Sequence, residues 1–450
     1  MAETDRRLFG TDGVRGTAGV SPLDPDTVAR LGAAVVRVLP HGTHRPHFLI
    51  GRDTRESGPW IEAAFTRGAT AAGALVTSLG VVPTPAVAYL TGATDDVTAG
   101  IVISASHNPF ADNGIKIFSG HGVKFTEAVE RAIEADVAQV APLGNGQAAA
   151  HQHTAPLEAY AAHLRRWAPP PDWCATVHVV LDCAHGATTT IAPALFASLG
   201  CRVDVIGDQP SGRNINEACG STHPEALAAR VVALGATLGV AFDGDGDRAI
   251  VIDAEGRIVN GDAVLLLCAE ALAREGRLRG DAVVATVMSN IGLELALRAR
   301  GIGLVRCPVG DRHVAEAMQA HDLVLGGEQS GHIIFGDVLS TGDGLCTAIH
   351  VLRAMASSGA SVAALASGLV SYPQVLLNVR VRERRPVDTV PALAAAIDEV
   401  ARQMAGQGRV LVRYSGTEPL LRIMLEGPDD ATIRRAAEAI ADVARATLGA

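Results

Sequence analysis

Three aspartates at alternating positions in the segment DGDGDR are the residues best suited to hold a metal ion. Single glycines separate Asp243, Asp245 and Asp247, so a tight turn can direct their carboxylates toward one point. Carboxylates that close repel one another unless a cation compensates them, and oxygen ligands favour Mg²⁺ or another hard divalent ion. An EF-hand does not fit, because that loop requires glycine and glutamate where this chain has Arg248 and Ala254. The remaining alternative is an acidic, solvated turn.

A second group of reactive side chains lies in ISASHNPFADNGIK, residues 103–116. It holds two serines, Ser104 and Ser106, a histidine, and the lysine Lys116. The chain has only one other lysine, Lys124, against 36 arginines. Since arginine serves wherever a plain surface cation suffices, a retained lysine indicates an amine that can lose its proton or fit a compact donor site. The alternative is a strand-to-loop turn whose polar side chains bond their own backbone.

Two further loops carry polar groups suited to a sugar phosphate. In GGEQSGH, residues 326–332, two glycines allow a sharp turn, and the side chains that suit a polyhydroxyl ligand are Glu328, Ser330 and His332. In RYSGTEP, residues 413–419, a guanidinium fork, hydroxyls and backbone N–H groups suit a phosphate; they belong to Arg413, Ser415, Gly416 and Thr417. A glycine-rich turn and a polar hairpin loop are the respective alternatives.

The elements that must position these loops alternate between short apolar strands and amphipathic helices. In three successive regions a buried-type strand precedes a polar loop, as in GIVIS, LGVAF and LVLGG. Loops beyond the carboxyl ends of strands are the usual functional sites of sheets flanked by helices. The last region differs, because VLLNVRVRERR, RVLVRY and LLRIMLEG combine with two helices into a smaller α+β unit.

The length of 450 residues allows about three or four domains. We predict three α/β domains, each with one of the first three polar loops, and a fourth α+β domain with the loop RYSGTEP. Their expected bounds are 1–150, 156–255, 256–370 and 371–450. The Gly/Ala/His-rich segment LGNGQAAAHQHTAP, residues 143–156, is the linker candidate.

Composition narrows the classes of function. A formal net charge of -10 argues against a nucleic-acid binder or a protein that binds anionic membranes, but leaves room for a locally positive cleft. The polar N-terminus is no signal peptide, and the most apolar run, 263–273, is too short to span a bilayer. Seven dispersed cysteines without a C-x-x-C pair predict reduced thiols in a cytoplasm and do not support zinc.

Taken together, the motifs resemble the α-D-phosphohexomutase superfamily over essentially the full chain, and within it the subgroup that acts on glucosamine phosphates. Five motifs occur in the family's order: LFGTDGVRG (8–16), ISASHNPFADNGIK (103–116), DGDGDR (243–248), GGEQSGH (326–332) and RYSGTEP (413–419). The resemblance implies a four-domain architecture around a central cleft. Three related α/β domains with mixed sheets would precede a smaller C-terminal α+β domain.

The resemblance also implies a role for each site residue. Ser106, but not Ser104, matches the family's phosphoserine, whose phosphate would complete a Mg²⁺ site with the three aspartates. Arg248 and His107 would stabilise charge on the transferred phosphoryl group. Lys116, with Arg15 beside it, would assist proton transfer through a pKa lowered by a cationic site. The sugar would be held by Glu328, Ser330 and His332, and the phosphate that is not reacting by Arg413, Ser415, Gly416 and Thr417.

The implied reaction interconverts glucosamine 6-phosphate and glucosamine 1-phosphate through a 1,6-bisphosphate, with glucosamine or glucose 1,6-bisphosphate as activator. Its product would feed UDP-N-acetylglucosamine and cell-wall synthesis. A phosphomannomutase or phosphoglucomutase of the same superfamily is the nearest alternative. A non-catalytic sugar-phosphate sensor is the other, although Ser106, Lys116 and the aspartates are all retained. The expected partners are small sugar phosphates, with no nucleic acid and no membrane; the oligomeric state stays open, with a homodimer among the alternatives.

Overall fold

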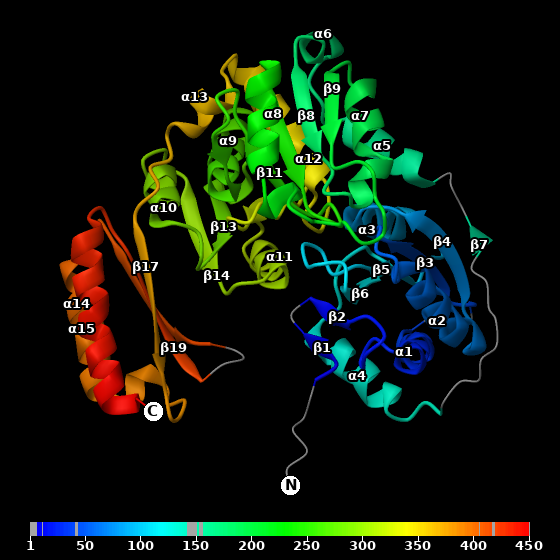
Figure 1. Cartoon of the computed structure of the whole chain (residues 1–450), viewed down its shortest axis with the longest axis horizontal. Coiled ribbons are helices and arrows are strands. Elements are labelled where there is room, and N and C mark those ends of the chain that lie inside the picture. The colour runs from blue at the N-terminus through cyan, green and yellow to red at the C-terminus, as the bar shows by residue number, and fades with distance from the viewer. Residues whose placement is uncertain are drawn as a thin grey trace. The chain divides into compact units, whose positions relative to one another are not determined.

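The computed structural model divides the chain into two compact units. It describes residues 7–10, 12–40, 44–141, 151–152, 156–404, 406–415 and 419–449. The first unit comprises Met1–Met288 with Ile302–Ser367, and the second comprises Ser289–Gly301 with Gly368–Ala450. Most of the second unit is orange to red in Figure 1. The predicted linker, 143–156, falls outside the described residues except at 151–152 and 156. The predicted domain bounds therefore stay predictions.

The first sheet is mixed and carries helices on both faces. Its strands are β1 (Phe9–Gly10), β2 (Gly13–Thr17), β3 (His47–Arg52), β4 (Leu75–Val81), β5 (Ala99–Ile103), β6 (Asp112–Ser119) and β7 (His151–Gln152), in the order β1-β2-β6-β5-β3-β4-β7. Its helices are α1 (Pro25–Val38), α2 (Gly58–Ala71), α3 (Thr84–Ala93) and α4 (Glu127–Val137). Residues of β3 alternate between the faces: Phe48 and Ile50 join the core with α1, α2 and α4, while Leu49 packs with Leu90 of α3.

Two further mixed sheets follow within the first unit. The second, ordered β12-β11-β10-β8-β9, contains β8 (His178–Asp182), β9 (Arg202–Ile206), β10 (Leu238–Phe242), β11 (Ala249–Ile252) and β12 (Ile258–Val259). The third, ordered β14-β13-β15-β16, contains β13 (Ala282–Thr286), β14 (Gly303–Cys307), β15 (Leu325–Gly327) and β16 (Ile333–Phe335). The remaining helices of this unit are α5 (Pro156–Arg165), α6 (Pro171–Cys174), α7 (Ala192–Ser198), α8 (Glu225–Leu234), α9 (Gly261–Arg274), α11 (Asp311–Ala320), α12 (Gly344–Ser358) and α13 (Val362–Ala366), with 3₁₀ turns at Ala187–Thr190, Gly220–Thr222 and Arg279–Asp281.

The second unit is built on an antiparallel sheet ordered β17-β19-β18. Its elements are α10 (Ile291–Arg298), β17 (Gln374–Arg380), a 3₁₀ turn at Val387–Thr389, α14 (Pro391–Gln403), β18 (Arg409–Tyr414), β19 (Leu420–Glu426) and α15 (Asp430–Leu448). Leu421, Ile423 and Leu425 alternate along β19 and share a core with Ile433 and Ile440 of α15. Figure 1 shows α14 and α15 on the same face of this sheet. The predicted fold class, mixed α/β sheets with a smaller C-terminal α+β domain, is confirmed.

Buried strands deliver the polar loops of the first unit, as the sequence predicts. All residues of β5, β10 and β15 are buried, and each strand leads directly into one of these loops. Lys116 lies on β6, a strand that the sequence interpretation did not identify, because Pro109 was expected to end any regular pairing. Helix α12 contacts the metal loop at its N-terminus. Asp343 caps this helix, and the Gly344 N–H donates to the Gly246 carbonyl at 3.0 Å.

Within the described ranges, no helix has the length and apolarity needed to cross a bilayer. The seven cysteines are all buried as free thiols.

Candidate active site

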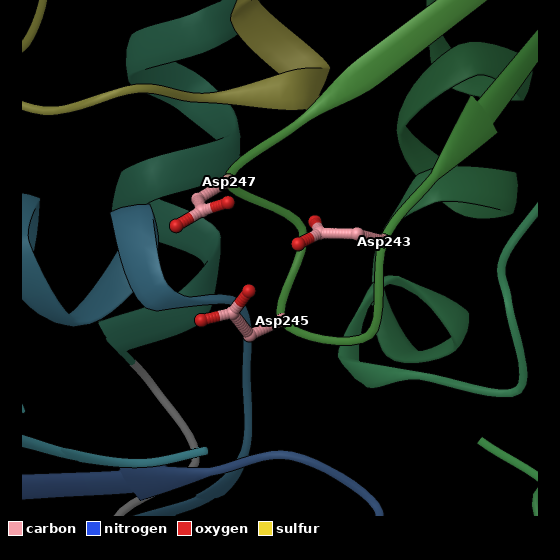
Figure 2. A group of neighbouring side chains, drawn as sticks. All are labelled: Asp243, Asp245 and Asp247. Carbon is pink, nitrogen blue, oxygen red and sulfur yellow. The ribbon is translucent and has the colours of Figure 1, made fainter. Parts of the chain in front are cut away.

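The three aspartates of the loop after β10 form one compact cluster. One carboxylate oxygen from each of Asp243, Asp245 and Asp247 lies within 4.8 Å of the others. Figure 2 shows the three carboxylates of this single turn facing a shared space. All three side chains are buried. Gly244 is required here, because a Cβ at this position would lie 2.6 Å from the Ser106 carbonyl oxygen.

The chemistry of this cluster fits a divalent cation. The Oδ1 atoms of Asp245 and Asp247 are buried and have no hydrogen-bond partner among the described residues. Burial and the two neighbouring carboxylates raise the pKa of Asp243 well above its usual range. Like charges held together in a buried site are stabilised when a cation binds between them. The predicted oxygen-only ligand set is therefore present as a geometric unit.

The two serines of the loop after β5 have different surroundings. The Ser106 hydroxyl donates to Asp243 Oδ2 at 2.5 Å and lies 3.2 Å from His107 Nδ1. The Ser104 hydroxyl instead donates to Asp53 Oδ2 at 2.6 Å and accepts the Ser106 backbone N–H at 2.9 Å. Ser106 has a backbone φ of 52°, an uncommon left-handed conformation for a serine. Ser104 thus supports the backbone, and Ser106 presents its hydroxyl to the aspartates.

Arg248 and His107 lie side by side next to this hydroxyl. Arg248 Nη1 is 3.1 Å from His107 Nδ1, and the Arg248 backbone N–H donates to Asp243 Oδ1 at 3.1 Å. Burial, together with the positive charges of Arg248 and Arg15, lowers the pKa of His107 to about 4. The imidazole is therefore neutral near pH 7, so Arg248 supplies the positive charge of this pair.

Lys116 is buried among carboxylates. Its Nζ lies 2.9 Å from Asp245 Oδ2, 3.3 Å from Asp247 Oδ2 and 3.2 Å from Asp12 Oδ2. The expectation of a lowered pKa is wrong for this arrangement. Burial alone would lower the pKa of Lys116, but the three carboxylates outweigh it and raise the pKa well above its usual range. Arg15 approaches from β2 and bonds both the Asp12 carboxylate and, at 3.2 Å, the Ala105 carbonyl.

A cavity of about 440 Å³ lies beside this centre, and the predicted sugar loop lines part of it. The cavity is lined in part by Arg15, His107, Arg248, Glu328 and His332. Glu328 Oε1 accepts the Gly310 backbone N–H at 3.1 Å, which directs this side chain from the end of β15. His332 Nε2 accepts the Gly342 backbone N–H at 3.2 Å, while its Nδ1 lies 3.6 Å from Asp247 Oδ1.

Another predicted ligand group of the first unit, Ser330, does not line this cavity. Ser330 is exposed next to Glu328, 3.4 Å from its Oε2. In the second unit, Arg413 is half-buried on β18, opposite Arg422 of β19, and Ser415 is buried at the end of the strand. Gly416 and Thr417 fall outside the described residues. The role of the loop RYSGTEP therefore stays a prediction.

Sequence reasoning missed three residues that support this centre. Asp12 contacts Lys116 and Arg15, and Lys124 contacts Asp12. Arg55 is fully buried beneath the Ser106 loop. The scarcity of lysine was a usable signal for Lys124. Nothing in the segment GRDTR, residues 51–55, predicts that Arg55 would be buried against the Ser106 loop.

Comparisons with known proteins identify the family of this chain. Four models of the phosphoglucomutase/phosphomannomutase family match the chain in order: alpha/beta/alpha domain I at residues 6–142, domain II at 158–256, domain III at 260–372 and the C-terminal domain at 376–443. A phosphoglucosamine mutase of Bacillus licheniformis is 46% identical over 449 residues, covering 99% of both chains. One from Thermoanaerobacter pseudethanolicus is 45% identical over 443 residues, covering 97% of this chain and 98% of the relative.

Solved structures share the architecture. A phosphoglucomutase/phosphomannomutase family protein from Burkholderia thailandensis superposes with a TM-score of 0.80 at 25% identity, covering 98% of this chain and 97% of the other. The N-acetylphosphoglucosamine mutase of Aspergillus fumigatus shares the fold with a TM-score of 0.67 at 17% identity, covering 98% of this chain and 96% of the other. The chain therefore belongs to the phosphoglucomutase/phosphomannomutase family of the α-D-phosphohexomutase superfamily, in its phosphoglucosamine mutase branch.

Proposed function

We propose that this mutase interconverts glucosamine 6-phosphate and glucosamine 1-phosphate, with Ser106 as the residue that carries the phosphoryl group. The observation that carries the proposal is the position of the Ser106 hydroxyl. It contacts the aspartate cluster and His107, next to a cavity that Glu328 also lines. Relatives named phosphoglucosamine mutase, matching nearly the full chain, support the amino sugar as substrate.

The aspartate cluster is proposed to hold Mg²⁺. Asp243, Asp245 and Asp247 would supply carboxylate oxygens, and a phosphate on Ser106 would supply another. Bound there, Mg²⁺ would offset the roughly −1.5 to −2 charge of a phosphoserine. Arg248, 3.8 Å from Asp247 through its Nε, brings a second positive charge to the same side of the serine. This arrangement suits phosphoryl transfer, in which charge on the phosphoryl oxygens is the main quantity to stabilise.

The first half-reaction transfers the phosphoryl group from Ser106 to the sugar. A bond forms between the sugar O1 and phosphorus, and the bond between Ser106 Oγ and phosphorus breaks. The proton lost from O1 is balanced by the one that Ser106 Oγ gains as its bond to phosphorus breaks. Lys116 with Arg15 is proposed to take part in this exchange, the ammonium donating a proton before it accepts one. The high pKa of Lys116 makes the ammonium the resting form in the described arrangement.

The second half-reaction returns the phosphate at C6 to Ser106, so the 1,6-bisphosphate must turn around between the two steps. Glu328, Ser330 and His332 are proposed to hold the sugar hydroxyls. The loop with Arg413, Ser415, Gly416 and Thr417 is proposed to bind the phosphate that is not reacting. Glucosamine or glucose 1,6-bisphosphate would act as activator, because either can restore phosphate to an unphosphorylated Ser106.

An assay of three substrates tests the proposal. Turnover efficiency is compared for glucosamine, glucose and mannose 6-phosphates, with Mg²⁺ and a trace of glucose 1,6-bisphosphate. We expect a clear preference for the amino sugar. A preference for glucose or mannose phosphate would keep the mechanism and overturn the substrate, and turnover of none would favour a sugar-phosphate sensor.

The cellular setting is also a proposal. The seven buried free thiols suit a reducing cytoplasm. The product would supply UDP-N-acetylglucosamine synthesis. A homodimer is one arrangement that sedimentation can test.

A further inference from the structure

The only two lysines of the chain converge on one carboxylate, that of Asp12. Lys116 Nζ lies 3.2 Å from Asp12 Oδ2, and Lys124 Nζ bonds Asp12 Oδ1. Arg15 also bonds Asp12 Oδ2 through Nη2. Asp12 therefore connects Lys124 to the two residues proposed to assist proton transfer.

Lys124 is held between two carboxylates that come from distant parts of the first unit. Its Nζ bonds Asp311, the first residue of α11, as well as Asp12. The side chain is only 15% exposed, so water competes weakly for the ammonium. Its backbone forms an isolated antiparallel bridge with Phe118 of β6, two residues beyond Lys116 on the same strand. Both lysines are thus anchored to one strand and aimed at one acidic group.

The contact between Lys124 and Asp311 also lies next to a residue proposed to bind the sugar, Glu328. Asp311 follows Gly310, whose backbone N–H donates to Glu328 Oε1 at 3.1 Å. A displaced Asp311 would move that N–H, and the direction of Glu328 depends on it. Lys124 therefore lies between the group that handles the proton and a group proposed to bind the sugar.

We propose that Lys124 is a positioning residue of the mutase reaction. It fixes the rotation of the Asp12 carboxylate, and Asp12 in turn holds the Lys116 ammonium and the Arg15 guanidinium in place. This inference rests on the proposed roles of Lys116 and Arg15. Without Lys124, Asp12 Oδ1 loses its ammonium partner. The carboxylate is then held through Oδ2 alone, by Lys116 and Arg15, and can rotate about that contact.

The alternative is that Lys124 forms an ordinary ion pair that only docks α11, and the molecule contains a matched example of such a pair. Arg312, the residue after Asp311, pairs with Glu130 of α4 through Nη1 at 3.0 Å. Both Arg312 and Glu130 have side chains 12% exposed, similar to Lys124. This pair joins α11 to α4 and, among the described contacts, does not involve Asp12, so its loss reports only the docking of α11.

The test compares Lys124→Met, Lys124→Arg and Arg312→Met in the full chain, with kcat, KM and thermal unfolding measured for each. We expect Lys124→Met to lower kcat by about 10- to 100-fold, the range seen when a reacting group is misplaced by about 1 Å, with KM within about threefold of the wild type. Lys124→Arg should recover most of kcat, and Arg312→Met should keep kcat within about twofold, because Arg312 lies outside the group of charges around Asp12.

The inference is overturned if Lys124→Met and Arg312→Met reduce kcat equally, or if Lys124→Met retains wild-type kcat. Lys124→Gln, which keeps a polar side chain, answers the same question should the methionine variant not fold. Failure of the proposed function is distinguishable, since the wild type would then turn over none of the three sugar phosphates.

Discussion

The serine loop, residues 104–112, and the metal loop, residues 243–248, meet at the contact between Ser106 and Asp243, but they are stabilised in opposite ways. Side chains satisfy the backbone of the serine loop. Arg55 uses all five guanidinium N–H donors: Nε donates to Asp53 Oδ2 at 2.8 Å, Nη2 to the carbonyls of Ser106 and Asn108, and Nη1 to those of Pro109 and Asp112. Asn216 Nδ2 adds a second bond to the Ser106 carbonyl at 2.9 Å.

The metal loop is held mainly through its backbone. The N–H groups of Ala187, Thr84 and Gly344 donate to the carbonyls of Gly244, Asp245 and Gly246, at 2.8, 2.8 and 3.0 Å. Two of its carboxylate oxygens remain without hydrogen-bond partners in the described part of the chain. One loop is therefore fixed so that a single hydroxyl points in one direction. The other is fixed so that carboxylate oxygens remain available to a cation.

The largest expected effect comes from removing the hydroxyl that joins the two loops. Ser106→Ala should lower mutase turnover by at least about 10³-fold, because the proposed nucleophile is lost while the backbone bonds of the loop remain. Thermal unfolding should stay close to that of the wild type. A variant that keeps substantial turnover would contradict the role given to Ser106.

Disturbing the metal loop should have the next largest effect. Chelation of divalent ions should abolish turnover and added Mg²⁺ should restore it, and Asp245→Asn should lower kcat by about 10²-fold, in line with several kcal/mol of charge stabilisation from a metal ion.

Asp253→Asn is the matched control for the metal loop. Asp253 is a buried aspartate that follows β11, and it bonds Arg257 at 2.7 Å rather than facing the cluster. Equal losses in the two variants, or full activity after chelation, would count against a cation site at Asp243, Asp245 and Asp247.

Weakening the serine loop should affect both stability and rate. Arg55→Lys keeps the charge but offers three donors in place of five, so buried carbonyls lose partners and the free energy of unfolding should fall by about 2 kcal/mol. We expect kcat to fall by about tenfold as Ser106 shifts. Arg52→Lys is the control, because the Arg52 guanidinium bonds only the Glu62 side chain, at 2.9 Å, among the described contacts. If Arg55→Lys and Arg52→Lys had the same unfolding free energy and the same kcat, Arg55 would not be what holds the serine loop.

The smallest effect is a change of stability with pH that arises in α12, the helix whose N-terminus contacts the metal loop. Burial lowers the pKa of His350 on α12 to about 4, whereas an unfolded histidine titrates near 6.5. The unfolded chain therefore takes up this proton first, and the stabilising contribution present above pH 6.5 is lost as the pH falls toward 4. Between pH 7 and 4.5 the wild type should lose about 2 kcal/mol more unfolding free energy than His350→Gln. If chemical denaturation gave the wild type and His350→Gln parallel profiles of unfolding free energy against pH, this prediction would be wrong.

The sequence predicts the strands and loops well where a local pattern determines them. The apolar runs before Ser104, Asp243 and Glu328 are buried strands, and the DGDGDR turn gathers its carboxylates as the alternating glycines predict. The strand that carries Lys116 was not predicted, since Pro109 was expected to end regular pairing and Lys116 puts a charge at a buried strand position.

Residues that act through distant contacts could not be predicted. Arg55 bonds carbonyls more than 50 positions away, and Lys124 pairs with Asp12 and Asp311, 112 and 187 positions away. The wrong pKa direction for Lys116 has the same origin. A local pattern reveals neither that Asp12 joins the two metal-loop aspartates around the ammonium nor that Arg15 is neutralised by the same carboxylate.

The central claim is that Ser106, and not Ser104, carries the phosphoryl group, and locating the phosphate tests it most directly. The protein is incubated with Mg²⁺ and glucose 1,6-bisphosphate, and the phosphorylated position in the peptide 103–116 is mapped by fragmentation mass spectrometry. We predict one phosphate on Ser106, none on Ser104, and none on this peptide in Ser106→Ala. Phosphate on Ser104, or a phosphorylated peptide in the alanine variant, would contradict the account.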